Sequence, residues 1–318
     1  MKTKVVYAVV SSECDYFIEQ LKLSIVSLRS HNSEVTVELV VDEDTYNGLQ
    51  GTRLSIKEMV NNIHVVKCPI EYTSVQKSRF LKTNIRSTVE GTFLFLDCDT
   101  LICDSLDDID NCDFDISMVA DLNGPLLLQD VNTIQKYARA GFGDATGVPY
   151  FNSGVIFSKD NLKTHNFFDS WKKNLAVSFE HGVMYDQPAL CATNEKLGRM
   201  INELSGVWNC QYKMYGMRFL NNAKILHYYS NNGINYLQNN NMHFLLNTVK
   251  SQVVLSAPVC EILRNAKTKF YALTTITIEQ QLNLLNSPML WLLSNRPRVF
   301  GLVVKLASFL ETFFYNKK

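Results

Sequence analysis

Two aspartates that follow an unbroken apolar run are the residues whose types and spacing point most directly to chemistry. Residues 93–102 read Phe-Leu-Phe-Leu-Asp-Cys-Asp-Thr-Leu-Ile, and four consecutive large apolar residues predict a central strand that is buried on both faces, as in a parallel sheet. Because side chains alternate along an extended chain, Asp97 and Asp99 should point the same way and share one ligand. Beyond the carboxyl end of such a strand, two carboxylates suit Mg²⁺ or Mn²⁺ carrying a diphosphate. The alternative is a solvated acidic turn.

Basic residues precede this pair on a predicted helix. Residues 77–85 include Lys77, Arg79 and Lys82 with apolar residues between them. On a helix, Arg79 and Lys82 share one face at positions i and i+3, so a basic edge would lie close to a phosphate site and balance its charge. The alternative is an ordinary solvated helix face.

Further polar residues follow predicted strands. Asp121 ends an apolar-rich strand over residues 114–120. Asn152-Ser153-Gly154 follows two aromatic residues and is predicted as a turn that leads into a core strand over residues 155–157. Such a turn brings a carboxamide and bare backbone close to a pocket, as sugar recognition requires. It is equally compatible with a purely structural turn.

Two later segments carry titratable residues. The sequence Asp186-Gln187-Pro188 predicts a helix start, with Asp186 as the cap and Pro188 in the first turn. Residues 223–229 predict a short apolar strand that contains His227. A lone histidine on an apolar strand is more often a packed core residue than a ligand.

The elements that must position these residues alternate between strands and helices. Residues 4–10, 35–41 and 63–66 predict strands, and apolar residues recur at helical spacing from residue 15 to 30, with Ser12 or Asp15 available as the cap. This βαβ start predicts a doubly wound α/β sheet. The turn after the first strand lacks G-x-G-x-x-G and the chain has no P-loop sequence, which argues against a dinucleotide-binding domain and a P-loop NTPase.

Composition limits the class of protein. The 318 residues are 46% apolar, enough for a large core, and lysine plus arginine equals aspartate plus glutamate at 31 each, so no global field would attract nucleic acid. The eight cysteines show no C-x-x-C pairing, which argues against a zinc cluster or a disulfide framework. With no apolar secretion signal after Met1, a cytoplasmic location is expected.

The order of the motifs resembles the GT-A glycosyltransferases, most closely glycosyltransferase family 8, which includes glycogenin-like and lipopolysaccharide galactosyltransferase-like enzymes. A buried strand ending in Asp-x-Asp is followed by aromatic-Asn-Ser-Gly, Asp-Gln-Pro, Trp-Asn and a strand ending in histidine, over residues 5–229. The resemblance implies a GT-A fold with a Rossmann-like, mostly parallel sheet. It also implies a retaining transferase that uses a nucleotide-sugar and Mn²⁺ or Mg²⁺.

The resemblance also implies roles for single residues. The metal would be held by Asp97, Asp99 and His227. Asp186 and Gln187 would lie near the anomeric carbon. The donor sugar and nucleotide would be held by a larger set, namely Asp121 at the sugar hydroxyls and Ala8, Val9, Ser11, Arg79, Lys82, Asp97, Cys98, Asn152 and Ser153. Whether Arg79 or Lys82 contacts the diphosphate is open, and the His-Tyr-x-Gly-x-x-Lys-Pro-Trp segment of the family is absent after His227.

The chemistry of these residue types favours one course of reaction. Breaking a glycosyl phosphate leaves a nucleoside diphosphate, so the main task is to stabilise charge on the leaving oxygens. An imidazole ligand favours Mn²⁺ over Mg²⁺. Retention by two displacements would need a carboxylate on the opposite face of the anomeric carbon, and the residue that the resemblance places there, Gln187, is a poor nucleophile. We therefore expect the acceptor hydroxyl to attack from the face that the phosphate leaves, with a phosphate oxygen taking its proton. With the resemblance, we expect a UDP-sugar donor and a glycan or lipid-linked acceptor, as in cell-surface polysaccharide synthesis.

The remainder of the chain predicts an extension. We expect a catalytic domain over residues 1–235 and a helical extension over residues 236–318. Residues 299–314 place apolar side chains on one helical stripe, with Lys305 and Thr312 on the other side. With nearby basic residues, this fits an interfacial helix on the cytoplasmic face of a membrane. No apolar stretch is long enough to span a bilayer. The alternative is a helix packed on the catalytic domain or on a second subunit of a homodimer.

Two other functions compete with the transferase. Asp97-Cys98-Asp99-Thr100 after an apolar strand also resembles the nucleophile loop of haloacid-dehalogenase-like phosphatases, in which Asp97 would be the nucleophile. Those enzymes usually carry the motif on the first strand with a glycine that is missing here. A non-catalytic nucleotide-sugar-binding protein is the other alternative.

Overall fold

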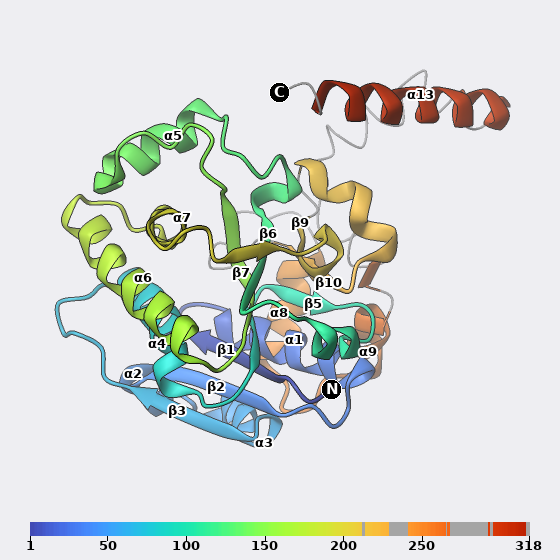
Figure 1. Ribbon diagram of the computed structural model, residues 1–318. Coiled ribbons are helices and arrows are strands. Elements are labelled where there is room, and N and C mark those ends of the chain that lie inside the picture. The colour runs from blue at the N-terminus through green and yellow to red at the C-terminus, as the bar shows by residue number, and fades with distance from the viewer. Residues whose placement is uncertain (212–213, 229–240, 265, 268–291, 293–294, 316–318) are drawn as a thin grey trace. The chain divides into compact units, whose positions relative to one another are not determined.

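The computed structural model describes residues 1–211, 214–228, 241–264, 266–267, 292 and 295–315. Its contacts divide the chain into two compact units, Met1–Phe270 and Tyr271–Lys318. The first unit contains both sheets of Figure 1. The domain boundary expected between residues 235 and 236 lies outside the described residues.

The first unit is built on a seven-stranded sheet with the order β3-β2-β1-β4-β7-β6-β8. β1 pairs in parallel with β2 and β4, β2 with β3, and β6 with β8, whereas β7 runs antiparallel to β4 and β6. The predicted α/β fold with a mostly parallel sheet is therefore confirmed. The strands are β1 Lys4–Val9, β2 Val37–Asp42, β3 Asn62–Val66, β4 Phe93–Leu96, β6 Ile116–Ala120, β7 Phe151–Ser158 and β8 Ile201–Glu203.

A second, three-stranded sheet has the order β5-β10-β9 and comprises β5 Thr100–Ile102, β10 Ile225–His227 and β9 Cys210–Gln211. The strand predicted from the apolar run at residues 93–96 is β4, and the chain turns at residues 97–99 before β5 begins in the second sheet. β10 pairs antiparallel with β5 in a register that sets His227 opposite Thr100. This pairing brings His227, from late in the chain, beside Asp99.

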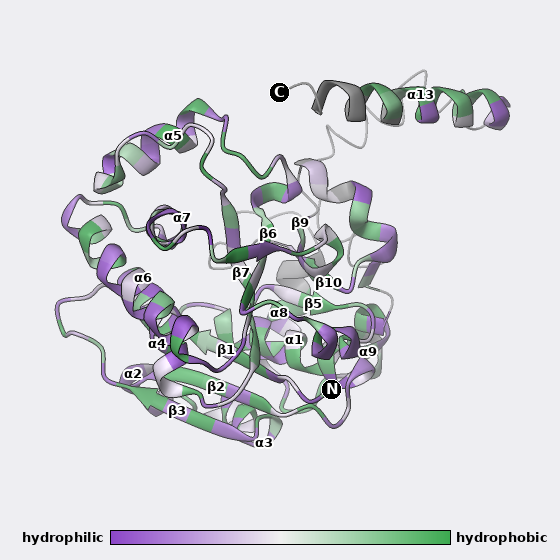
Figure 2. Ribbon diagram, in the orientation of Figure 1, coloured by the Kyte–Doolittle hydropathy of each residue, from purple (hydrophilic) through white to green (hydrophobic). Residues whose placement is uncertain are grey.

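Helices cover both faces of the large sheet (Figure 1). On one face, α1 (Phe17–His31) packs on Val5 and Tyr7 of β1. On the other face, α4 (Ser74–Thr88) packs on β1, and Val6 points to this face because neighbouring strand residues point to opposite faces. α6 (Leu162–Glu180) contacts α4 there, and its Phe168 ring meets Phe93 of β4 edge to face. Figure 2 shows the predominantly apolar strands between these helices, which is the burial that the continuous apolar runs predict.

The remaining elements connect and extend this core. Helices α8 and α9 contact α1 within the first unit, where Leu246 and Leu263 join Leu23 in one apolar cluster. The other elements, in chain order, are α2 Glu43–Asn47, η1 Gly51–Ser55, α3 Ile56–Met59, η2 Asp107–Asn111, η3 Asp121–Asn123, α5 Val131–Tyr137, η4 Ala138–Phe142, α7 Asp186–Lys196, η5 Gly206–Asn209, η6 Met214–Asn222, α8 Asn241–Lys250, α9 Ala257–Arg264 and α13 Pro297–Tyr315.

Two predicted helix caps are wrong. Tyr16 is the N-cap of α1, while the Asp15 carboxylate accepts hydrogen bonds from the backbone N–H groups of Ser12 and Phe17 at 2.6 and 3.1 Å and so closes the preceding loop. Tyr185 is the N-cap of α7, and Asp186 is the first helical residue. The side chain of Asp186 is directed to partners in other elements, which explains why it does not cap its own helix.

The Asn-Ser-Gly segment is also not a turn. Residues 152–154 lie inside β7, where the register with β6 shifts between Met118 and Val119. The backbone N–H of Gly154 donates to Asn152 Oδ1 at 2.9 Å, a local bond that accompanies this irregularity. A turn is predicted here because these residue types favour turns. The segment is nevertheless extended, because β7 pairs with β4 on one side and with β6 on the other.

The second unit contains α13. Leu306 and Leu310, which belong to the expected stripe, are exposed, and so are Leu302, Val304 and Phe309 outside it. Among the described residues, no helix combines the length and apolar character needed to cross a membrane.

Candidate active site

Two carboxylates and one imidazole converge beyond the end of β4. One ligand atom each from Asp97, Asp99 and His227 lies within 4.8 Å of the others, and His227 Nε2 is 3.1 Å from Asp99 Oδ1. The aspartates converge through the turn between β4 and β5 and not, as expected, by alternation along one extended strand. The mixed oxygen and nitrogen donors fit a divalent transition metal such as Mn²⁺.

His227 is almost fully buried, with 2% of its surface exposed. Burial disfavours the charged imidazolium, but the neighbouring Asp99 carboxylate outweighs it, so the pKa of His227 is raised. His227 is therefore a core residue by burial and a member of the polar cluster by its contacts.

Lys82 of α4 connects this cluster to Asp186. Its Nζ lies 2.9 Å from Asp97 Oδ1 and 3.4 Å from Asp186 Oδ2, and it donates to the carbonyl oxygen of Ser153 at 3.2 Å. The lysine is 4% exposed, so the alternative of a solvated helix face is wrong at this position. Arg79 lies farther along the same face, with Nε 3.7 Å from Asp186 Oδ1.

Asp186 is held as an anion. Ser153 Oγ donates to Asp186 Oδ2 at 2.8 Å. Burial alone would favour the neutral acid, but the Lys82 ammonium and the Arg79 guanidinium outweigh it and lower the pKa of Asp186 to about 2. Burial would likewise lower the pKa of Lys82, but Asp97 and Asp186 raise it above its ordinary value. The pair is thus charged at neutral pH.

A second group of side chains surrounds Asp121. Asn152 Nδ2 donates to Asp121 Oδ1 at 3.0 Å, and Gln187 Nε2 donates to the carbonyl oxygen of Phe151 at 3.2 Å. Burial raises the pKa of Asp121, although hydrogen bonds from Asn152 and Gln187 work against the rise. The structure therefore brings together Asp121, Asn152 and Gln187, the residues to which the resemblance assigns the sugar and the anomeric carbon.

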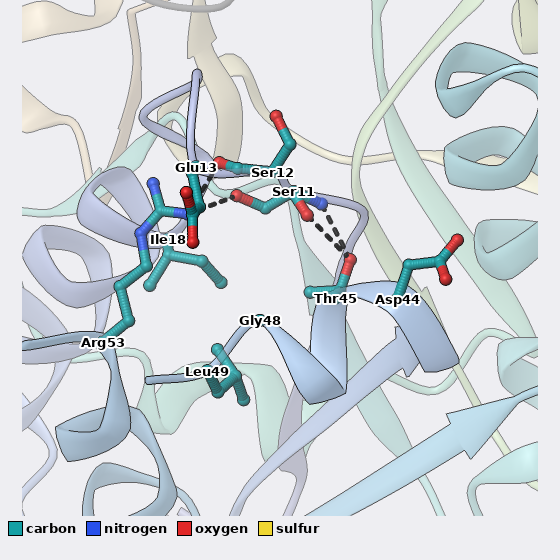
Figure 3. A pocket seen from close by; sticks show the side chains of 9 residues that line it. All are labelled: Ser11, Ser12, Glu13, Ile18, Asp44, Thr45, Gly48, Leu49 and Arg53. Carbon is teal, nitrogen blue, oxygen red and sulfur yellow. Dashed lines mark hydrogen bonds between the residues drawn. The ribbon is translucent and has the colours of Figure 1, made fainter. Parts of the chain in front are cut away.

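The end of β1 lies beside the Asp-x-Asp turn. Cys98 Sγ is 4.0 Å from the carbonyl oxygen of Ala8, and burial raises the pKa of the Cys98 thiol well above its ordinary value. The Val9 side chain is buried in the core. Ser11 lies farther on, in the pocket of about 200 Å³ shown in Figure 3, where its backbone N–H donates to Thr45 Oγ1 at 2.8 Å.

Comparison with known proteins identifies the family. The family model described as Glycosyl transferase family 8 matches residues 8–233. The chain belongs to glycosyl transferase family 8. Family 8 membership makes the protein a glycosyltransferase, so the phosphatase interpretation of Asp97 and the non-catalytic alternative are both set aside.

The two structures of LgtC that match agree with the GT-A fold. The galactosyltransferase LgtC in complex with donor and acceptor sugar analogues is 15% identical, with 80% of this chain and 98% of LgtC covered and a TM-score of 0.53. An active-site mutant of LgtC is 13% identical, with the same coverage and a TM-score of 0.51. Mouse xyloside xylosyltransferase 1 in its apo form is 15% identical, covers 71% of this chain and 97% of its own, and has a TM-score of 0.46. No curated protein sequence matches.

Two polar residues of this family 8 site received no role from the sequence. Gln211 Oε1 accepts from the backbone N–H of Leu122 at 2.6 Å, and Gln211 Nε2 donates to the carbonyl oxygen of Ala120 at 3.0 Å, so its amide holds the peptides on both sides of Asp121. Asn209 joins Asn152 to His227 through its side-chain amide. Asn209 belongs to the Trp-Asn pair, which marks its segment, whereas no sequence signal marks Gln211.

Proposed function

We propose that this family 8 enzyme uses a divalent cation to transfer a hexose, with retention, from a UDP-sugar to a glycan or lipid-linked acceptor. The convergence of Asp97, Asp99 and His227 carries the proposal. Two carboxylates with one imidazole suit Mn²⁺ better than Mg²⁺, which prefers oxygen ligands alone. When bound there, the cation would act as a Lewis acid that stabilises the departing nucleoside diphosphate.

Lys82 is the basic residue that we assign to the diphosphate. Its ammonium contacts Asp97 directly, whereas Arg79 contacts Asp186. A buried, fixed positive charge next to the metal ligands stabilises charge that develops on the leaving oxygens, and it needs no reorganisation to do so. Ala8, Ser11 and Cys98 are proposed to line the nucleotide site, with the backbone of Val9.

The sugar half of the site would consist of Asp121, Asn152 and Gln187, with Asp186 next to it. Asp121 and Asn152 have carboxylate and amide groups suited to sugar hydroxyls. Asp186 is anionic but is engaged by Lys82 and Ser153, which leaves it poorly suited to attack carbon. We therefore favour attack by the acceptor hydroxyl from the face that the phosphate leaves: the bond from carbon to the acceptor oxygen forms, the bond to phosphate breaks, and a phosphate oxygen takes the hydroxyl proton.

The character of α13 supports a proposal about the setting of the reaction. Its exposed apolar residues Leu302, Leu306 and Phe309 lie on a helix that follows Arg296 directly and has Arg298 in its first turn. Such a helix fits the surface of an anionic membrane. We propose a catalytic domain over residues 1–235 and an extension over 236–318 that docks the enzyme on the cytoplasmic face of the membrane, where cell-surface polysaccharide is assembled. Association into a homodimer through the same helix is the alternative, and vesicle binding by monomeric protein would distinguish the two.

The proposal is tested by following nucleotide release. The purified chain is incubated with Mn²⁺ and a panel of UDP-, GDP- and CMP-sugars, beside an Asp97→Ala, Asp99→Ala variant and an Asp113→Ala control outside the site. Slow hydrolysis of one UDP-sugar, lost in the double variant and without Mn²⁺ but kept in the control, supports the proposal. Equal hydrolysis with and without the cation contradicts metal dependence, and a glycosyl adduct on Asp186 found by mass spectrometry contradicts same-face attack.

A further inference from the structure

A chain of buried side-chain amides links His227 to β7. His227 Nδ1 is 3.0 Å from Asn209 Oδ1, and Asn209 Nδ2 donates to Asn152 Oδ1 at 2.9 Å. The exposed fractions of His227, Asn209 and Asn152 are 2%, 0% and 5%. Because unmatched polar groups are costly at such depth, the donors and acceptors along this chain must alternate.

A backbone group at one end fixes the direction of the chain. The N–H of Gly154 can only donate, and it lies 2.9 Å from the side chain of Asn152, so the Asn152 atom facing it is the oxygen. That same oxygen faces Asn209, which must therefore present its NH₂ group there. Asn209 in turn presents its oxygen to His227 Nδ1. The Nδ1 atom of His227 must carry the proton.

The other ring nitrogen then faces the carboxylates. In a neutral imidazole that is protonated at Nδ1, the lone pair is on Nε2, and His227 Nε2 lies 3.1 Å from Asp99 Oδ1 within the Asp97, Asp99 and His227 cluster. We propose that Asn209 is the positioning residue that fixes the His227 tautomer and ring orientation, so that Nε2 is available to the cation. The inference rests on the proposed cation-dependent function.

Asn209 is itself held in place from several directions. The backbone carbonyl oxygen of Asn209 accepts a hydrogen bond from Asn123 Nδ2 at 3.0 Å, and its side-chain NH₂ group donates to Asn152 Oδ1. Rotating the amide by half a turn would place NH₂ against the Nδ1 proton and oxygen against Asn152 Oδ1, two repulsive contacts in a buried site. Partners of this kind orient metal-bound histidines and raise their basicity.

Variants at Asn209 test the inference by calorimetric titration with Mn²⁺, without any donor sugar. Asn209→Leu removes the acceptor and should weaken Mn²⁺ binding roughly 10–100-fold. Asn209→Asp keeps an acceptor for the Nδ1 proton but sets a second oxygen against Asn152 Oδ1, so its Mn²⁺ affinity should lie between those of Asn209→Leu and the wild-type chain. Asn194→Leu replaces an equally buried asparagine of α7 and controls for the structural cost. Full affinity in folded Asn209→Leu would overturn the inference, and absence of Mn²⁺ binding in the wild-type chain would overturn the proposed function as well.

A spectroscopic measurement on the unaltered chain does not depend on the folding of any variant. Ring nitrogen NMR with diamagnetic Zn²⁺ bound, with His227 assigned by comparison with His227→Gln, reports which nitrogen carries the proton. We expect a protonated Nδ1 and a metal-bound Nε2. A metal-bound Nδ1, or a proton that remains on Nε2 with the ion bound, overturns the inference even if the cation is required for activity.

Discussion

The imidazole ring of His227 packs directly against the backbone of Gly154. A β-carbon placed on Gly154 would lie 2.4 Å from Cε1 and 2.8 Å from Nδ1 of His227, which is far inside van der Waals contact. β10 supplies the histidine and β7 supplies the glycine, so the missing side chain lets the two sheets approach closely. The glycine of the Asn-Ser-Gly segment therefore makes room for the histidine.

Replacing Gly154 with alanine should displace the His227 ring from Asp97 and Asp99. We expect Mn²⁺ affinity to fall roughly 10–100-fold, the range found when the orientation of a metal ligand is disturbed. Calorimetric titration measures the change. Gly301→Ala is the matched control, because a β-carbon there meets nothing within 4 Å. Equal Mn²⁺ affinity in the two variants would show that His227 is not a ligand or that its ring can move freely.

Replacing Lys82 with methionine should destabilise the fold as well as the site. Removing one partner of a buried ion pair leaves an uncompensated charge and costs about 3–5 kcal/mol. We expect a loss near the lower figure, because the Asp97 side chain is partly exposed. Urea unfolding measures the free energy. Lys163→Met, which breaks an exposed pair with Asp115, should cost no more than about 1 kcal/mol, and a similar loss in both variants contradicts the prediction.

The ionisation of Asp186 should make stability depend on acid. Its pKa is lowered in the folded protein to about 2 from an ordinary value of 3.8. A lowered carboxyl pKa contributes stability that is fully present above the unfolded value and is lost as the pH falls through the folded value. The free energy of unfolding should therefore decrease between about pH 4 and pH 2, by on the order of 2 kcal/mol from this group. Asp186→Asn should show a shallower decrease over this range, and equal slopes would contradict the assignment.

The sequence predicted what depends on local runs of residues. Apolar runs located the strands, and the end of the run at Leu96 located the first two carboxylates. The turn at residues 97–99, which brings Asp97 and Asp99 together, was not predictable. It depends on the pairing of β5 with β10, and β10 lies more than a hundred residues later in the chain. His227 was linked to the aspartates only through the order of the family motifs, since its own segment predicts an ordinary core histidine.

Polar residues that act on other polar residues were the hardest to predict. Asn209 bonds to Asn152 across 57 positions of the chain, and Gln211 bonds to Ala120 across 91. Neither contact produces a periodic pattern or a change of composition in the sequence, because each requires only one side-chain amide at one position. The Asn-Ser-Gly segment differs from its predicted turn for a similar reason, because pairing with two neighbouring strands outweighs its turn-forming residue types.

Gln211 offers a test of positioning in the sugar half of the site. Its side chain bridges the peptides on either side of Asp121, and the next two residues, Leu122 and Asn123, have left-handed φ values of 54° and 53°. Such conformations cost on the order of 1–3 kcal/mol and persist only when the surroundings impose them. Gln211→Leu removes the side-chain bonds, so the strained residues can relax and Asp121 can move.

We expect this relaxation to offset the lost hydrogen bonds, each of which contributes about 1 kcal/mol, so that the free energy of unfolding changes little. Donor turnover should nevertheless fall, by up to roughly 10²-fold, because a small displacement of a substrate-positioning group is enough for such a loss. Nucleotide release at saturating donor, paired with urea unfolding, separates the two effects. Gln50→Leu controls for loss of a glutamine whose amide donates to the carbonyl oxygen of Asn47 in its own loop. If Gln211→Leu loses stability and activity in proportion, Gln211 serves the fold and not the placement of Asp121.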